Sequence, residues 1–253
     1  MSIQQTHEQL LALVEQFDAV CTANHIPYTL HGGSLLGAIR EQGFIPWDDD
    51  VDTAMTRDAF EKLEQVLAQD DRFYLYGGIK KQFRRRGEDS LWVDIFVCDP
   101  IGTGTQRKKK LFWLTVLDIM NRDKNSIRLS HFSQYGIGKR LAFRGAYWLG
   151  KLFPRRAKVR WYTRISRDKY GGDGSRLHRS NDQYKGRKED FPAAWMTSFR
   201  RVPFETATLS VMTHAHDMLV KCYGETYMTP VRDERNQDVH NLVRGTGKGD
   251  VQL

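Results

Sequence analysis

The segment from Leu30 to Asp52 combines two kinds of chemistry in one short stretch, LHGGSLLGAIREQGFIPWDDDVD. Asp48, Asp50 and Asp52 alternate along the chain, so in an extended conformation their side chains point to one side. Carboxylates that converge repel one another, and a bound cation offsets that repulsion. Because ligands made only of oxygen select hard ions, the pattern predicts a Mg²⁺ or Mn²⁺ site.

A lone aspartate further along the chain extends this prediction. Asp94 is the one charged residue in the apolar run Leu91–Val97, which predicts a strand buried on both faces. If that strand neighbours the first one, Asp94 meets the alternating aspartates and joins Asp48, Asp50 and Asp52 as a metal ligand. Divalent ions held between carboxylates and substrate phosphates serve phosphoryl transfer.

The glycines before the aspartates predict a place for a phosphate. Gly32 and Gly33 precede Ser34, which we expect to cap a short helix that runs to Arg40. A glycine turn leaves backbone N–H groups accessible, and the helix N-terminus adds partial positive charge. The segment therefore predicts a phosphate-binding turn close to a metal site.

The spacing of the aspartates has two other interpretations, an EF-hand calcium loop and a solvated acidic turn. The Asp-x-Asp-x-Asp pattern also begins an EF-hand loop, but the sixth and twelfth positions of such a loop would be Thr53 and Ala59 instead of glycine and glutamate, which excludes it. A solvated acidic turn is the second alternative. The alternation around Val51 and the partner Asp94 favour the metal site.

The predicted elements give an α/β (α+β) fold with a small mixed sheet and flanking helices. We expect strands at 28–30, 50–55, 73–76 and 91–97, a hairpin or loop at 80–90, and a loop at 171–190. Helices are expected at 5–24, from Thr56 to Leu67, and at 111–120, 141–153, 160–170 and 206–223. We divide the chain into a core of residues 1–104, a basic helical segment of 105–170, and a C-terminal part of 171–253 that completes the site. Trp47 and Trp92 are expected in the core.

Composition narrows the class of protein. The 253 residues contain no run of about 20 apolar residues, the length that a bilayer span needs. The start lacks the basic head of a signal peptide, and three distant cysteines, Cys21, Cys98 and Cys222, fit neither a disulfide framework nor a metal motif. We therefore expect a reduced, cytoplasmic protein.

The positive charge of the chain is concentrated in one block. Residues 105–170 hold 18 Lys and Arg against 3 Asp, a net charge of +15 in a chain whose total is +8. Aromatic and basic residues alternate there as in interfacial helices, which predicts peripheral contact with the anionic inner face of the cell membrane. Recognition of a phosphate-rich acceptor is a second interpretation. Nucleic-acid binding is the third, because the chain contains no RNA-binding motif. Solvated helix faces account for part of the charge in any case.

The quoted motifs together resemble a known family. Gly32–Arg40 and Gly43–Asp52, followed by the lone Asp94, are similar to the signature of the LicD family, within the nucleotidyltransferase-fold superfamily. That family includes bacterial phosphocholine transferases and fukutin-related proteins. Weaker likenesses follow at Phe191-Pro192 and at Tyr223–Met228.

The resemblance implies a nucleotidyltransferase-like fold and a particular reaction. A phospho-substituent, phosphocholine first, would pass from a CDP-linked donor such as CDP-choline to a hydroxyl of a cell-surface glycan of the lipopolysaccharide, capsule or teichoic acid type, with release of CMP. Asp50 and Asp52 would hold Mg²⁺, and Asp94 would complete the site or accept a proton. Arg40 would offset phosphoryl charge. The implied phosphate-contacting and donor-binding residues are Gly32, Gly33, Ser34, Arg235 and His240.

Two rival functions stay open from the residues alone. A nucleotidyltransferase that adds nucleotides from an NTP to RNA or a small molecule would use the same carboxylates. A non-catalytic basic adaptor on membranes would use the aspartates only as a structural cation site.

Overall fold

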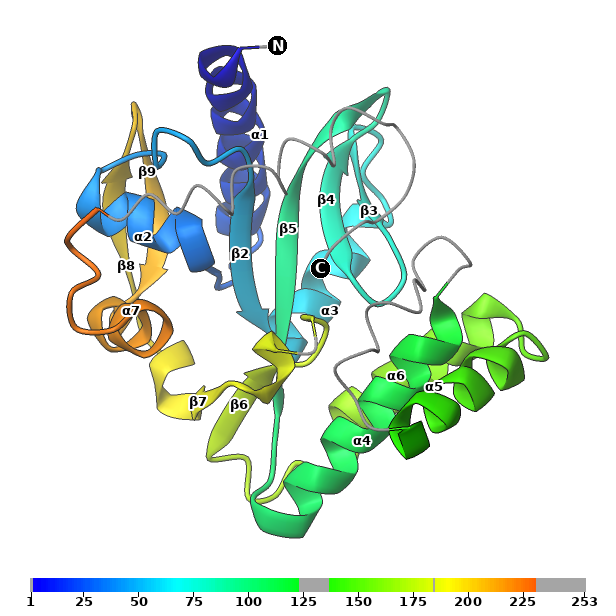
Figure 1. The fold of residues 1–253 in the computed structure, drawn as a ribbon. Helices are drawn as coiled ribbons and strands as arrows, with labels where there is room; N and C mark the ends of the chain where they lie inside the picture. Colours follow the sequence, from blue (N-terminus) through cyan, green and yellow to red (C-terminus); the bar gives the residue numbers. More distant parts are fainter. Residues whose placement is uncertain (1, 123–136, 184, 231–253) are drawn as a thin grey trace.

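The computed structural model describes residues 2–122, 137–183 and 185–230, and it shows a mixed sheet with helices on both faces (Figure 1). The predicted α+β fold is thereby confirmed. In chain order the elements are α1 (Ile3–Ala23), β1 (Thr29–Leu30), α2 (Gly32–Arg40), β2 (Val51–Thr56), α3 (Arg57–Leu67), β3 (Phe73–Tyr76), β4 (Lys81–Arg85), β5 (Glu88–Pro100), α4 (Gly104–Asn121), α5 (Ile137–Gly150), α6 (Arg155–Asp168), β6 (Arg176–Arg179), β7 (Asp190–Pro192), β8 (Phe199–Phe204), β9 (Ala207–Met212) and α7 (Ala215–Tyr223).

The central sheet has the order β1-β2-β5-β4-β3, and β6 and β7 extend it beside the end of β5. β2 and β5 run parallel, whereas the other pairs in this sheet are antiparallel. The segment 80–90 forms the hairpin between β4 and β5, one of its two predicted forms. The parallel pair at the centre brings together two chain segments about forty residues apart, Val51–Thr56 and Val93–Cys98.

One face of the sheet is covered by the first helix. Leu10, Val14 and Phe17 of α1 are fully buried and share a helix face, and they pack in one core with residues of β2 and β5. Ser2 caps α1 in a capping box with Gln5. Thr56 caps α3 as predicted, since its side chain accepts a hydrogen bond from the Ala59 N–H. This packing leaves the other face of β2 and β5 free to carry polar side chains.

The strand around Asp94 is not buried on both faces, contrary to the prediction. Val93, Ile95 and Val97 are buried against the core, whereas Trp92, Asp94 and Phe96 on the other face are only half-buried. The prediction missed this because two of the outward residues, Trp92 and Phe96, are aromatic, so the sequence does not alternate between apolar and polar residues.

Two predictions for the C-terminal part are wrong. Residues 171–190 do not form a loop, because β6 pairs with β5 and with β7. The segment 206–223 is not one helix: Ala207–Met212 is strand β9, paired with β8, and only Ala215–Tyr223 is helical. Both regions contribute buried side chains to the main core, among them Leu177, Leu209 and Met218. Residues of the C-terminal part thus complete the same core as the first hundred residues.

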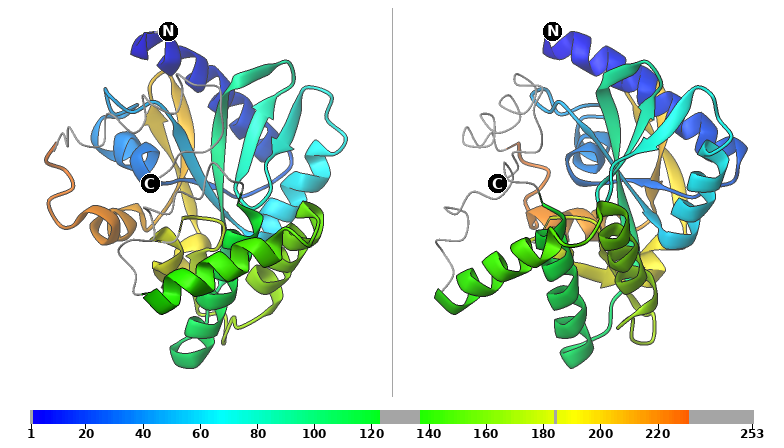
Figure 2. Two further views of the ribbon diagram at one scale, coloured as in Figure 1. Left: turned by 45° about the vertical axis from the view of Figure 1, so that its right-hand side comes forward. Right: turned by 90° about the vertical axis from the view of Figure 1, so that its right-hand side faces the viewer.

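The three helices of the basic block, α4 to α6, form a unit with its own small core of Leu114, Leu117, Met120 and Tyr162 (Figure 2). We call it the helical unit. Lys158 is buried, and its ammonium group donates to the Met120 and Gly150 carbonyls at the ends of α4 and α5, at 2.8 and 2.9 Å. A lysine suits these helix C-termini because they carry partial negative charge. The predicted three-part division of the chain stays a prediction.

Buried ion pairs join the sheet region to the helical unit and to α3. Arg187, which is 1% exposed, donates to the Tyr162 hydroxyl and to the Asp118 carboxylate. Asp99 at the end of β5 accepts two hydrogen bonds from Arg57, at 2.9 and 2.6 Å.

Within the described ranges, no helix is long and apolar enough to cross a bilayer.

Candidate active site

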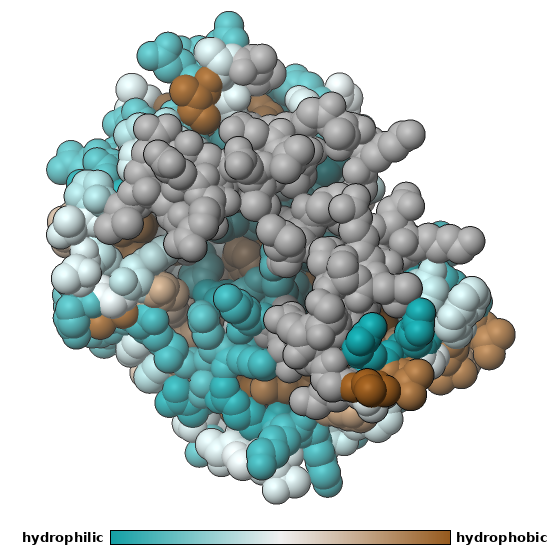
Figure 3. Space-filling model, viewed as in Figure 1, coloured by the Kyte–Doolittle hydropathy of each residue, from teal (hydrophilic) through white to brown (hydrophobic). Residues whose placement is uncertain are grey.

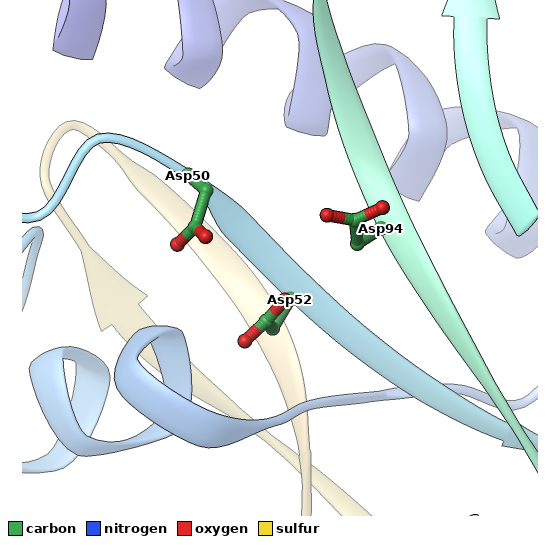
Figure 4. Close-up of side chains that lie close together, drawn as sticks. All are labelled: Asp50, Asp52 and Asp94. Carbon is green, nitrogen blue, oxygen red and sulfur yellow. The ribbon is translucent and has the colours of Figure 1, made fainter. Parts of the chain in front are cut away.

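Asp50, Asp52 and Asp94 come together on the face of the sheet away from α1, and we call them the aspartate cluster. Asp52 and Asp94 are direct partners in the parallel register of β2 and β5, and Asp50 immediately precedes β2. One carboxylate oxygen from each residue lies within 4.8 Å of the other two. Figure 4 shows Asp94 on its own strand beside the strand that carries the other pair. The predicted meeting of Asp94 with Asp50 and Asp52 is confirmed in geometry.

The electrostatics of the aspartate cluster fit a divalent cation. Burial, followed by the charges of Asp50 and Asp94, raises the pKa of Asp52 well above its ordinary value. Burial and the charge of Asp50 raise the pKa of Asp94 to about 6. Burial and the repulsion between like charges both make the charged carboxylates unfavourable, and a cation between them would offset that cost. The all-oxygen donor set suits Mg²⁺ or Mn²⁺.

Two neighbours fix the orientation of Asp94. The Gln82 side-chain amide donates to Asp94 Oδ1 at 3.1 Å, and the Trp92 indole N–H donates to Oδ2 at 3.2 Å. Both hydrogen bonds act to lower the Asp94 pKa, against the effect of burial. The prediction of Trp92 as core is therefore wrong, and so is that of Trp47, which is 37% exposed. Trp92 stands two residues before Asp94, so the alternation of a strand could have placed it on the same face.

The start of α2 is attached to β2 at Asp52. The Asp52 N–H donates to Ser34 Oγ at 2.9 Å, and the His31 N–H donates to the Asp52 carbonyl at 2.9 Å. The prediction that Ser34 caps this helix is therefore wrong. His31 is the N-cap residue, and Ser34 lies inside the first turn. The buried hydroxyl of Ser34 positions the backbone of Asp52.

The two glycines of this turn lie directly against carboxylates. Gly32 has φ +54, and a Cβ there would be 2.7 Å from Asp52 Oδ2. A Cβ on Gly33 would be 2.3 Å from Asp48 Oδ2. A side chain at Gly33 would displace the Asp48 carboxylate, and one at Gly32 would displace the Asp52 carboxylate and strain the left-handed backbone there as well. The phosphate-binding role of the turn stays a prediction.

Of the other predicted site residues, Asp48 and Arg40 are not members of the aspartate cluster. Asp48 is outside the group of oxygens that lie within 4.8 Å of one another. Arg40 lies at the far end of α2, where it bonds Glu41 at 2.6 Å and the Tyr227 carbonyl at 3.3 Å. Arg235 and His240 fall outside the described residues.

The residues 171–190, predicted as a loop, supply a second group of charges near the cluster. Arg179 is buried and bonds His31, Asp182 at 2.8 Å and Glu189 at 2.9 Å. The charge of Asp182 contributes to the raised pKa of Asp52, so this group lies within electrostatic range of the aspartate cluster. Sequence reasoning missed it because polar short strands carry no apolar alternation.

Alanine at the two glycines should separate the roles of Asp52 and Asp48. Gly32→Ala forces strain and displaces the Asp52 carboxylate, so we expect it to weaken Mg²⁺ binding at least tenfold, the effect of disturbing a group that orients a ligand. Gly33→Ala displaces only the Asp48 side chain, and we expect near-native Mg²⁺ affinity. Isothermal titration of each variant measures this. Equal loss in both variants would instead make Asp48 a ligand.

Comparison with known proteins agrees with the motifs. The lipopolysaccharide cholinephosphotransferase LicD of Haemophilus influenzae is 26% identical over 269 residues, which cover 92% of this chain and 93% of that protein. An uncharacterized protein of Rickettsia prowazekii is 31% identical over 115 residues, 46% of this chain and 39% of that protein. The chain spans most of the first relative and less than half of the second.

The matched family region includes the whole aspartate cluster. The profile of the LicD/FKTN/FKRP nucleotidyltransferase domain matches residues 25–113, from the turn before β1 into α4. All three clustered carboxylates and the Gly32-Gly33-Ser34 turn lie within that range. Residues 25–113 therefore match the LicD-family nucleotidyltransferase domain, and the similarity to a LicD protein extends along almost the whole chain.

Proposed function

We propose that this protein is a divalent-metal-dependent transferase that moves phosphocholine, or a similar phospho-substituent, from a CDP-linked donor to a hydroxyl of a cell-surface glycan. The observation that carries the proposal is the aspartate cluster, three carboxylates from two adjacent parallel strands. Similarity over almost the whole length to a lipopolysaccharide cholinephosphotransferase supports the choice of transferred group and acceptor.

In this proposal the residues of the chain have separate tasks. Asp50, Asp52 and Asp94 would hold Mg²⁺ or Mn²⁺, which when bound neutralises charge on phosphate oxygens. Gln82 and Trp92 orient Asp94, and Ser34 orients Asp52. The acceptor hydroxyl gives its proton to water, and its oxygen bonds the donor phosphorus distal to cytidine. The bond from that phosphorus to the bridging oxygen breaks, and CMP leaves with that oxygen. Fixed positions for both reactants supply much of the rate enhancement in such reactions.

Product analysis tests the proposal directly. The purified chain is incubated with Mg²⁺, a glycan acceptor and CDP-choline, CDP-ribitol, CDP-glycerol or CDP-ethanolamine in parallel, and with NTPs in a separate series. Release of CMP with labelled glycan supports the transferase. Pyrophosphate released from an NTP would show a nucleotidyltransferase instead. Retention of cellular function in Asp50→Ala and Asp94→Ala variants would favour a non-catalytic adaptor.

The metal-free protein should become more stable as the pH falls from 7 to 5. Because the pKa of Asp94 is raised from 3.8 to about 6, the folded state binds its proton more tightly than the unfolded chain does. The resulting stabilisation is complete below about pH 4 and is lost as the pH rises through 6. We therefore expect Asp94→Asn to raise the melting temperature at pH 7 and to flatten this part of the pH profile.

Calorimetry in the presence of a chelator measures both effects. Added Mg²⁺ should raise the melting temperature of the native protein at pH 7 and leave that of Asp94→Asn unchanged, because ligands that bind only the folded state stabilise it. A lower melting temperature of Asp94→Asn at pH 7 without metal would contradict the repulsion between the carboxylates.

A further inference from the structure

The outer face of α5 exposes a continuous apolar stripe. Ile137, Leu141 and Trp148 are 74%, 61% and 65% exposed, and Leu152, in the turn after α5, is 75% exposed. At about 100° per residue the three helical members fall within roughly 40° of one another. We call these four residues the apolar stripe. Figure 3 shows hydrophobic side chains gathered at the end of the molecule where Figure 1 places α5.

The apolar stripe is not an unpacked part of the small core. The opposite side of α5 is buried, where Tyr147 is 7% exposed and Gly150 packs against α4. A Cβ on Gly150 would lie 2.3 Å from the Met120 carbonyl oxygen, so the two helices approach as closely as backbones allow. The stripe therefore faces outward because α5 is already seated on its inner side.

The two other helices of the helical unit expose aromatic side chains as well. Phe112 and Trp113 of α4 are 59% and 43% exposed, and Trp161 of α6 is 38% exposed. Phe153 and Trp161 lie edge to face, with ring centroids 5.0 Å apart. An exposed apolar stripe such as the one on α5 marks a surface that contacts a partner.

The same surface is strongly basic. Arg140 and Arg144 are exposed on α5 along one border of the apolar stripe, in a block whose net charge is +15. Among the residues that the structure describes, the acids of this block form ion pairs: Asp118 pairs with Arg122 and Arg187, and Asp168 pairs with Arg167. The positive charge of the surface is therefore available to an anionic partner.

We propose that the helical unit docks on the surface of an anionic lipid bilayer, with the apolar stripe among the lipid headgroups and Arg140 and Arg144 against their charges. Amphipathic helices with tryptophan and leucine on one side and arginine around them bind membranes in this way. A second copy of this chain is disfavoured because it would bring two surfaces of like charge together. A nucleic acid offers phosphates but no apolar phase to receive leucine and isoleucine.

Docking would place the protein where lipid-linked glycans are, a link that rests on the proposed function. The docking itself does not depend on transfer activity. A vesicle-binding assay therefore tests the docking surface even if the protein transfers a different group.

Flotation of the full chain with lipid vesicles tests the proposal. We expect binding to vesicles of phosphatidylcholine with phosphatidylglycerol, much weaker binding to phosphatidylcholine alone, and a decrease with added NaCl. Arg140→Gln with Arg144→Gln should weaken binding about thirtyfold, since each basic residue near an anionic surface contributes roughly a fivefold factor. Trp148→Ser with Leu152→Ser should weaken it at least about tenfold through loss of buried apolar area.

Matched changes on another face serve as controls. Ile3→Ser on α1 and Arg86→Glu in the β4–β5 hairpin alter an exposed apolar and an exposed basic residue far from the stripe in sequence, and we expect native binding. Native binding by both stripe variants would overturn the proposal. So would a dimer in light scattering that the Trp148/Leu152 variant abolishes, or tight RNA binding without vesicle binding.

Discussion

Replacing Asp52 by asparagine is expected to lower the transfer rate by about a thousandfold, because a metal ion supplies several kcal/mol of transition-state stabilisation and each 1.4 kcal/mol is about a factor of ten. Burial, followed by the charges of Asp50 and Asp94, raises the pKa of Asp52, so this residue interacts with both other members of the cluster. The fold should persist, since the change removes a repelled charge. Turnover and CMP release measure the rate, and thermal denaturation checks the fold.

A matched aspartate outside the site gives the control for this change. Asp71 is exposed before β3, and Asp71→Asn should keep the native rate. Asp52→Asn should also lose the stabilisation by Mg²⁺ that the native protein shows. If Asp52→Asn turned over at the native rate, the aspartate cluster would not be the site of chemistry.

Replacing Arg57 by methionine is expected to destabilise the protein by about 3–5 kcal/mol, the cost of leaving a buried charge without its partner. The Asp99 side chain is completely buried, and Arg57 gives it two hydrogen bonds, at 2.9 and 2.6 Å. Ser180 also donates to Asp99, which joins the end of β5 to the residue after β6. Urea denaturation measures the loss of unfolding free energy.

An exposed ion pair provides the comparison for this prediction. The Arg72 side chain is 72% exposed and lies 3.0 Å from Asp70. Arg72→Met should therefore leave the free energy of unfolding almost unchanged. Similar losses in the two variants would mean that burial does not determine the strength of the Arg57–Asp99 pair.

The aspartate cluster could be predicted because side chains along a strand alternate between its two faces, with a period of two residues. That periodicity places Asp50 and Asp52 on one side, and the isolation of Asp94 in an apolar run marked it as a partner. The parallel register that makes Asp52 and Asp94 direct neighbours is a tertiary property that no local pattern contains. Gln82 could not be found for the same reason, since it reaches Asp94 only through the pairing of β4 with β5.

The errors near the C-terminus have local causes. The β8–β9 hairpin turns at Glu205 and Thr206, and Glu205 has φ 53, a conformation that usually signals itself by glycine or asparagine. Because the sequence lacks that signal, the apolar residues of β9 and α7 were predicted as one helix. In residues 171–190, buried polar groups such as His178 and Arg179 replace the apolar side chains by which strands are recognised.

If the helical unit docks on a membrane as proposed, the length of β5 would separate the aspartate cluster from that membrane. Pro100, where the strand ends and the helical unit follows, is six positions after Asp94, a span of about 20 Å at roughly 3.3 Å per residue. With the apolar stripe seated among the headgroups, the reacting hydroxyl would stand well clear of the lipid. The fold would then favour long acceptors. An oligosaccharide that extends over that distance would reach the aspartate cluster, whereas a single sugar bound directly to its lipid would not.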